Sequence, residues 1–169
     1  HQTASAEPSA YFKTLFNASA KVPAYLDVAD NVIKGLAMGI DEIGKEQKRQ
    51  ISDEEKKKIR EQSKKDIKSL NLSWLNQMVN SPQQLREKMS LFWHGHFASR
   101  NLNILYQQQL LDIIRRNALG NFGDLLTEVS KSAAMINFLN NNQNKKDHPN
   151  ENFAREVMEL FTLGRGNYS

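Results

Sequence analysis

Apolar residues recur at spacings of three and four positions along most of the chain, which is the pattern of amphipathic helices. A clear early example lies in residues 26–43, where the apolar positions are Leu26, Ala29, Ile33, Leu36, Ile40 and Ile43. Comparable spacing marks the further segments 52–80, 81–97, 101–120, 122–139 and 150–164. No alternation of apolar and polar residues, as strands show, interrupts them. The pattern predicts an all-α fold, an irregular bundle of about six or seven helices with no sheet.

Two serines mark expected helix starts. Glu55 follows Ser52 by three residues, and Gln84 follows Ser81 at the same spacing, with Pro82 between them. Such a pair can satisfy two backbone N–H groups reciprocally, and proline is favoured at the first helical position. We therefore expect one helix to begin just after each serine.

The helix that starts after Ser52 has two unlike halves. Its first half is almost wholly charged, so it should project into solvent. Its second half carries apolar residues at helical spacing and should dock on the core. These residues are Leu70, Trp74, Leu75 and Met78.

Glycine, proline and asparagine predict where other helices end. Gly120 is expected as a left-handed stop, and Gly164 should end the last helix. A break is expected near Ser130. The run "NNNQNKKDHPN" at residues 140–150 predicts a surface loop, because Asn, Asp and Pro disfavour regular structure.

Composition narrows the chemistry. The chain has 169 residues, of which 39% are hydrophobic, so it can bury a core as one domain. It has no cysteine, which excludes disulfides and thiolate metal sites. The net charge is +4, and the basic stretch "KKKIREQSKK" is interleaved with acids and has no aromatic residue. We therefore interpret it as a solvated helix face rather than a nucleic-acid surface. No apolar run reaches the roughly 20 residues of a membrane span.

The last helix carries an acidic and basic edge. Glu151, Arg155 and Glu159 are four residues apart, so the arginine can bridge two acids, and Glu156 and Glu159 could jointly hold a cation. From spacing alone, an exposed salt-bridged face is the favoured interpretation. An apolar face is expected on the same helix, formed by Phe153, Val157 and Leu160, with Phe161 adjoining it.

The segment "FWHGHF" at residues 92–97 places two histidines among aromatic residues. On a continuous helix His94 and His96 face opposite ways, and His96 continues the apolar stripe onto the buried face. If Gly95 breaks the helix, both imidazoles could point together as metal ligands. From spacing alone, structural histidines are favoured over a metal site.

We expect the last helix to pack against this aromatic segment, since both have apolar surface to bury. That packing would bring Arg155, Glu156 or Glu159 within reach of His94 or His96. A carboxylate beside an imidazole would raise the histidine pKa and lower its own.

Several long stretches together resemble one known family. They are "LREKMSLFWHGHFAS", "RRNALGNFGDLL", "SAAMINFLNN" and "NKKDHPNENFAREVMELFTLGRGNYS". In this order they resemble the bacterial family catalogued as domain of unknown function eighteen hundred, and the resemblance runs from about Trp74 to Ser169. The long charged helix is similar to that of Bacteroidetes-type members. The resemblance implies a variable N-terminal part, residues 1–80, and a family core segment, residues 81–169. It also implies one domain truncated at its C-terminus, because members are longer.

The resemblance implies that the polar signature residues of the family lie in two segments of this chain. Two hypotheses about their function follow. In the first, the protein is a metal-dependent enzyme or cofactor binder whose divalent metal is held by His94, His96, Glu156 and Glu159. Its catalytic candidates are His94, His96, Arg155 and Glu156. In the second, it is a non-catalytic module of the cell envelope, with the same residues in a structural network that includes Trp93, Asn150, Glu151 and Arg155.

The resemblance also implies location and partners. Family members are generally exported, so a periplasmic or cell-surface location is expected. They are often encoded beside a second exported, sulfatase-like family, which makes such a protein, or an envelope polysaccharide, the expected partner. Truncation would expose apolar surface and favour a homo-oligomer or a contact with the missing part. No nucleic acid and no membrane span are expected.

Overall fold

The computed structural model describes residues 8–31, 33–34, 52–146 and 151–168, and within them the chain is all-α, as predicted. The described helices are α1 (Pro8–Ser19), α3 (Asp53–Asn80), α4 (Gln84–His96), α5 (Ile104–Asn117), α6 (Phe122–Lys131), α7 (Ala133–Phe138) and α8 (Glu151–Glu156), which continues as the π-helix η2 (Val157–Thr162). A short 3₁₀ turn, η1, spans Asn141–Gln143. None of the helices in these ranges is both long and apolar enough to cross a membrane.

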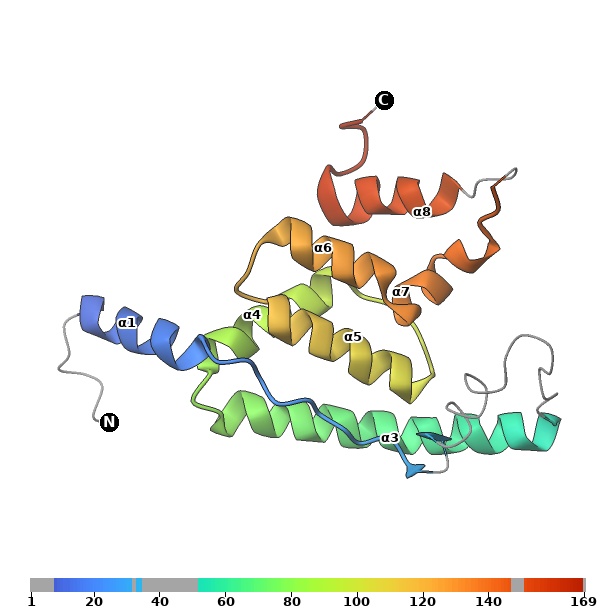
Figure 1. The fold of residues 1–169 in the computed structure, drawn as a ribbon, viewed down its shortest axis with the longest axis horizontal. Helices are drawn as coiled ribbons and strands as arrows, with labels where there is room; N and C mark the ends of the chain where they lie inside the picture. The colour runs from blue at the N-terminus through green and yellow to red at the C-terminus, as the bar shows by residue number, and fades with distance from the viewer. Residues whose placement is uncertain (1–7, 32, 35–51, 147–150, 169) are drawn as a thin grey trace.

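The long helix α3 forms one edge of the bundle, and α4, α5, α6 and α7 are stacked beside it, with α8 at the far side (Figure 1). Its start is the predicted capping box: the Ser52 hydroxyl accepts from the Glu55 N–H at 3.2 Å, and the Ser52 N–H donates to the Glu55 carboxylate at 2.9 Å. Leu70 and Trp74 are buried as expected. Leu75 is not, because it projects from the opposite side of the helix and is 54% exposed.

The prediction of a second capping box, at Ser81, is wrong. Helix α4 begins at Gln84 rather than directly after Ser81, and Ser81 is instead the C-cap of α3. The Ser81 hydroxyl accepts from the N–H of Gln83, two residues on, and the Gln84 side chain donates to the Ser81 carbonyl at 2.6 Å. With Ser81 in an extended conformation that ends α3, the chain needs this tight turn before it can start α4.

The helix expected at residues 26–43 does not begin at Leu26. Residues 22–30 have no regular structure and run along α3 as an extended segment (Figure 1). The part of the prediction beyond Lys34 lies outside the described residues. Side chains satisfy backbone donors of this segment: the Val28 N–H donates to the Gln108 amide oxygen and the Asp30 N–H to the Asp66 carboxylate. Bonds of this kind can replace the bonds of a helix, and we attribute the extended form to them.

Two apolar clusters make up the core, and α5 contributes to both. The first joins α4 to α8 and contains Phe97, Leu110, Ile114, Leu125, Val129, Ala134, Met135, Leu139 and Phe161. The second lies between α3, the extended segment and α5 and contains Ala29, Ile33, Leu70, Trp74, Ile104 and Leu111. This second cluster draws residues from both sides of the boundary expected at residues 80 and 81.

Two expected helix ends differ in detail. The break after α6 falls at Ser132 rather than Ser130, and the Ser132 hydroxyl accepts from the Met135 N–H as N-cap of α7. Gly120 is not left-handed: the positive φ angles among the described glycines are at Gly164 and Gly166. At the end of α5, side chains of α4 bind the last carbonyls, so a left-handed turn is not needed there.

The end of the last helix explains why one apolar residue was misplaced. The expected face consisted of Phe153, Val157 and Leu160, but Phe161 is buried and Leu160 is exposed. From Val157 the backbone is π-helical, and its bonds span five residues rather than four, as from the Leu163 N–H to the Met158 carbonyl. The wider turn carries position 161, rather than 160, onto the face that Val157 occupies.

Candidate functional site

The aromatic segment at residues 92–97 does pack against the last helix, as predicted. His96 is the point of contact: its Nε2 lies 3.0 Å from the Phe161 carbonyl oxygen, and the two rings are 6.1 Å apart. The Phe97 ring packs at 5.4 Å from that of Phe161. The contact therefore ties the end of α4 to the π-helical turn.

This contact determines which tautomer a neutral His96 ring adopts. A carbonyl oxygen can only accept a hydrogen bond, so Nε2 of a neutral ring must carry the proton. Nδ1 is then the lone-pair nitrogen, and within the described residues no hydrogen bond to it is formed. An imidazole oriented in this way by a carbonyl resembles those that bind metals or accept protons.

Aromatic rings surround His96 and form a partly open surface, which we call the aromatic surface and define as Phe92, Trp93, His96 and Phe122. The Phe92 and His96 rings are nearly parallel at 6.4 Å, and Trp93 lies 5.5 Å from Phe122. Phe92 is 58% exposed and Phe122 is 39% exposed, whereas Trp93 and His96 are half-buried. The Trp93 indole donates to the Ala118 carbonyl at 3.0 Å, which fixes its ring.

His94 lies in a different environment. Helix α4 continues through Gly95 to His96, so the two imidazoles face different parts of the molecule. The His94 ring packs edge-on against Trp74 at 5.1 Å, toward α3. Burial lowers the pKa of His94 from its ordinary value of 6.5, because the charged form would lose hydration. The alternative in which Gly95 breaks the helix and both imidazoles point together is therefore wrong.

The polar residues of the last helix form a separate cluster together with Tyr168, which follows the helix. We call it the α8 cluster and define it as Asn152, Arg155, Glu156, Glu159 and Tyr168. Arg155 lies 3.2 Å from the Glu156 carboxylate and 3.9 Å from that of Glu159, and it donates to the Asn152 amide oxygen at 2.8 Å. The Tyr168 hydroxyl donates to Glu159 at 2.6 Å, and this bond raises the pKa of Tyr168.

The structure thus divides the predicted site residues into three places: the aromatic surface, the Trp74–His94 contact and the α8 cluster. No hydrogen bond or ion pair between the described residues joins an imidazole to Glu156 or Glu159. In the same ranges, no three His, Asp or Glu side chains are grouped so that they could hold a metal ion. Glu151 is exposed at the start of α8, and Asn150 lies outside the described residues.

A buried ionic network that the sequence interpretation missed lies between α3, α4 and α5. Glu87 and Arg115 face each other with side chains 1% and 2% exposed, and Arg115 Nη2 lies 2.6 Å from Glu87 Oε1. Arg115 Nε also contacts both carboxylate oxygens, and the Trp74 indole donates to Glu87 at 2.9 Å. Arg115 Nη1 donates to the Ala24 carbonyl of the extended segment. We call Trp74, Glu87 and Arg115 the buried triad.

Arg86 extends the network to the end of α5. Its guanidinium donates at 2.8 Å to the carbonyls of both Arg115 and Arg116, in the last turn of α5, and to the Ser19 carbonyl at the end of α1. The free carbonyls at a helix C-terminus carry partial negative charge, so a cation there is stabilising. Burial lowers the pKa of Arg86. Arg86 therefore fixes three elements at one point.

The sequence contained a signal for this network. On α5 the positions Ile104, Gln108, Leu111 and Arg115 follow the three-and-four spacing, so Arg115 occupies a position on the buried stripe. A charged residue on such a stripe needs a buried partner of opposite charge. On α4 the apolar residues Leu85 and Met89 are only half-buried and Phe92 is exposed, whereas the buried residues are Arg86, Glu87 and Ser90.

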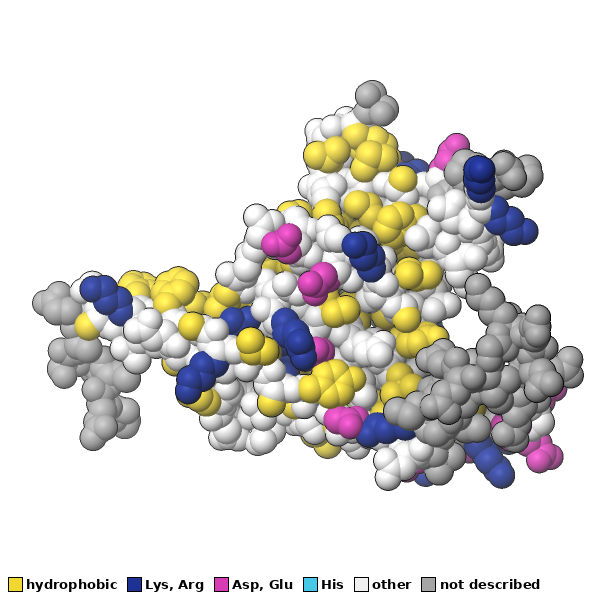
Figure 2. Space-filling view, in the orientation of Figure 1, with side chains coloured by type: hydrophobic (Ala, Val, Ile, Leu, Met, Phe, Trp, Pro, Cys, Tyr) yellow, Lys and Arg dark blue, Asp and Glu magenta, His cyan; other side chains and the backbone are white. Residues whose placement is uncertain are grey.

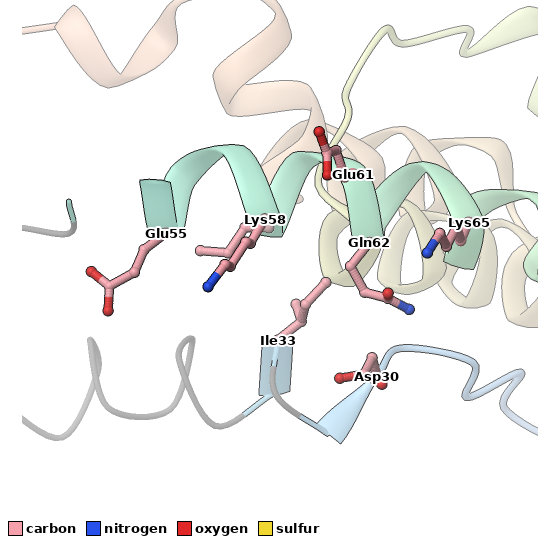
Figure 3. Close-up of a pocket in the computed structure, with 8 residues that line it drawn as sticks. Asp30, Ile33, Glu55, Lys58, Glu61, Gln62 and Lys65 are labelled. Carbon is pink, nitrogen blue, oxygen red and sulfur yellow. The ribbon is translucent and has the colours of Figure 1, made fainter. Parts of the chain in front are cut away.

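A hollow of about 490 Å³ lies between the charged half of α3 and the end of the extended segment (Figure 3). Its lining comprises Asp30, Ile33, Glu55, Lys58, Ile59, Glu61, Gln62 and Lys65. Three carboxylates and two ammonium groups give it mixed charge, and it contains none of the histidines. Its chemistry does not favour one class of ligand.

One of three comparisons with known proteins returned a match. A family model described as "Protein of unknown function (DUF1800)" matches residues 1–169. Neither the search of curated proteins nor that of solved structures returned a match. The chain belongs to the DUF1800 family.

Proposed function

We propose that this member of the DUF1800 family is a non-catalytic helical module that binds another protein through the aromatic surface. One observation carries the proposal: two large rings, Phe92 and Phe122, are left open to solvent on a base that hydrogen bonds hold in place. Aromatic rings are enriched at the centres of protein interfaces, because they bury much area at a low entropy cost. In line with the family resemblance, we expect the module to act after export, with another exported protein as its partner.

The α8 cluster supports a structural role for the acids that the metal hypothesis would use. Both Glu156 and Glu159 are paired with Arg155, and Glu159 also accepts from Tyr168. A carboxylate already neutralised by a guanidinium is a weaker ligand for a cation, since binding must first break the pair.

The test is a binding measurement, and its probe is an exported sulfatase-like protein of the kind that the family resemblance implies as partner. Phe92→Ala should weaken its binding at least about tenfold, which is the cost of losing one well-buried interface residue. Phe12→Ala is the matched control, because Phe12 on α1 is 57% exposed and does not belong to the aromatic surface. Equal loss in both variants, or no binding by the wild type, would contradict this function.

A second candidate function is metal binding or proton transfer at His96. Its fixed tautomer leaves Nδ1 available to bind a divalent metal or accept a proton. Titration with Zn²⁺ and Mn²⁺ followed by calorimetry tests it, with His96→Asn as the variant. Binding near micromolar affinity that this variant abolishes would favour the metal-dependent enzyme or cofactor binder over the binding module.

A further inference from the structure

Helix α3 has a second apolar stripe, on the side away from the core. It consists of Leu72, Leu75 and Val79, which are 68%, 54% and 67% exposed. At 100° per residue the stripe lies roughly 150° around the helix from Leu70 and Trp74, which face the core. α3 lies at the edge of the bundle (Figure 1), and the exposed fractions of these residues show that the described chain leaves this side of the helix open. We call these three residues the outer stripe.

The stretch of sequence that carries the outer stripe has no charged residue, in contrast with the first half of the helix. Twelve of the sixteen residues 53–68 are Asp, Glu, Lys or Arg, whereas residues 69–85 contain none. The stripe is flanked by amides instead, and Asn80 donates to Asn76 beside it at 2.7 Å. Exposed apolar residues within a charge-depleted area are the composition of the centre of an interface.

We propose that the outer stripe is a self-association surface and that its partner is the outer stripe of a second copy of this chain, in an antiparallel two-fold contact. The spacing of three and then four residues is that of helices that pack side by side. A two-fold axis at Leu75 places position 72 of one copy opposite position 78 of the other, one residue from Val79, so the same patch serves both copies.

The extent of the uncharged run matches this geometry. In an antiparallel pair centred on residue 75, position 68 of one helix lies opposite position 82 of the other. Lys68, the first charge before the run, therefore meets the neutral turn around Pro82 rather than another cation. For a chain with a net charge of +4, this surface is one where two copies can approach without like charges meeting.

The contact is independent of the aromatic surface and does not rest on the proposed function. Sedimentation equilibrium of the 169-residue chain should show a concentration-dependent mass that rises from 19.4 kDa toward twice that value. Leu75→Lys should weaken dimerisation at least about tenfold, because it places two ammonium groups at the axis. Leu160→Lys is the matched control, since Leu160 is 56% exposed on the distant π-helix, and it should leave the dimer intact.

Single cysteines test the register, because the chain has none of its own. Under mild oxidation Leu75→Cys should form a cross-linked dimer, and a mixture of Leu72→Cys and Val79→Cys should cross-link with each other more than either with itself. Far-UV circular dichroism of each variant should match the wild type, since the substituted positions are exposed. A monomer at every concentration, equal effects of the two lysine variants, or self-linking of Leu72→Cys alone would overturn the proposal.

Discussion

Two clusters in this molecule have the same chemistry and opposite surroundings. In the buried triad, Arg115 pairs with Glu87, and the Trp74 indole donates to the same carboxylate. In the α8 cluster, Arg155 pairs with Glu159, and the Tyr168 hydroxyl donates to it. The side chains of the first ion pair are 2% and 1% exposed, and those of the second are 52% and 21% exposed.

The difference teaches that burial, more than the identity of the residues, decides what such a cluster does. A buried charge that loses its partner keeps the full cost of its lost hydration, whereas an exposed one is rehydrated. The buried triad also links three helices, while the α8 cluster mainly joins one turn to the next. We therefore expect the first to determine stability and the second to be replaceable.

The largest expected difference comes from removing each arginine. Arg115→Met should lower the free energy of unfolding by about 3–5 kcal/mol, because Glu87 is left buried and unpaired. Arg155→Met should lower it by about 1 kcal/mol or less. Urea unfolding of both variants measures the two losses.

A double variant is the control for this prediction. Glu87→Met with Arg115→Met removes both charges together and should be more stable than Arg115→Met alone, since no unpaired ion remains. A double variant that is less stable than the single one would show that the packing of Glu87, rather than its charge, dominates.

The next largest difference in unfolding free energy between the two clusters should come from removing their aromatic hydrogen-bond donors, Trp74 and Tyr168. Trp74→Phe keeps most of the ring but removes the indole N–H from Glu87, which should cost about 1–3 kcal/mol. Tyr168→Phe should lower the unfolding free energy by much less, because water replaces the hydroxyl at the partly exposed Glu159. A comparable loss in both variants, measured by thermal unfolding at matched pH, would remove the distinction between the clusters.

Titration should separate the same two regions. The pKa of His94, which packs on Trp74, is lowered by burial, so its contribution to stability is present above its ordinary value of 6.5 and is lost as the pH falls below it. The pKa of Tyr168 is raised by its bond to Glu159, so its contribution is present below the ordinary value of 10.0 and is lost as the pH rises through the raised pKa. Unfolding curves between pH 5 and 11 should show His94→Phe flattening the acid limb and Tyr168→Phe the alkaline limb. An unchanged acid limb in His94→Phe would assign that loss to other groups.

Salt should produce the smallest effect. Between about 0.1 M and 1 M NaCl the screening length falls from about 10 Å to 3 Å. A double-mutant cycle on Arg155 and Glu159 should give a coupling of a few tenths of a kcal/mol that fades over this range. The same cycle on Glu87 and Arg115 should change little. Fading of both couplings would mean that solvent reaches the buried triad.

The features that could be predicted from the sequence are those that depend on residues close together along the chain. The all-α fold, the capping box at Ser52 and the charged edge of α8 follow from spacings of three and four residues, and all are present. The packing of the aromatic segment on the last helix followed from its large apolar area. Family resemblance identified the DUF1800 family from long collinear motifs.

What the sequence could not predict depends on partners far along the chain. Glu87 and Arg115 are 28 residues apart, and no local spacing connects them. The extended form of residues 22–30 accompanies side-chain bonds from α3 and α5, one of which joins residues 91 positions apart. The π-helical turn that exchanges Phe161 for Leu160 is a small change in backbone pitch with a large effect on which side chain is buried.

The sharing of α5 between the two apolar clusters has a consequence for how the chain unfolds. Leu110 and Ile114 belong to one cluster and Ile104 and Leu111 to the other, all within one fourteen-residue helix. Because α5 is one rigid helix, it cannot move away from one cluster without also losing its contacts with the other. The two halves of the molecule should thus melt in a single cooperative transition, and local opening should begin at the elements that touch only one cluster, such as α8.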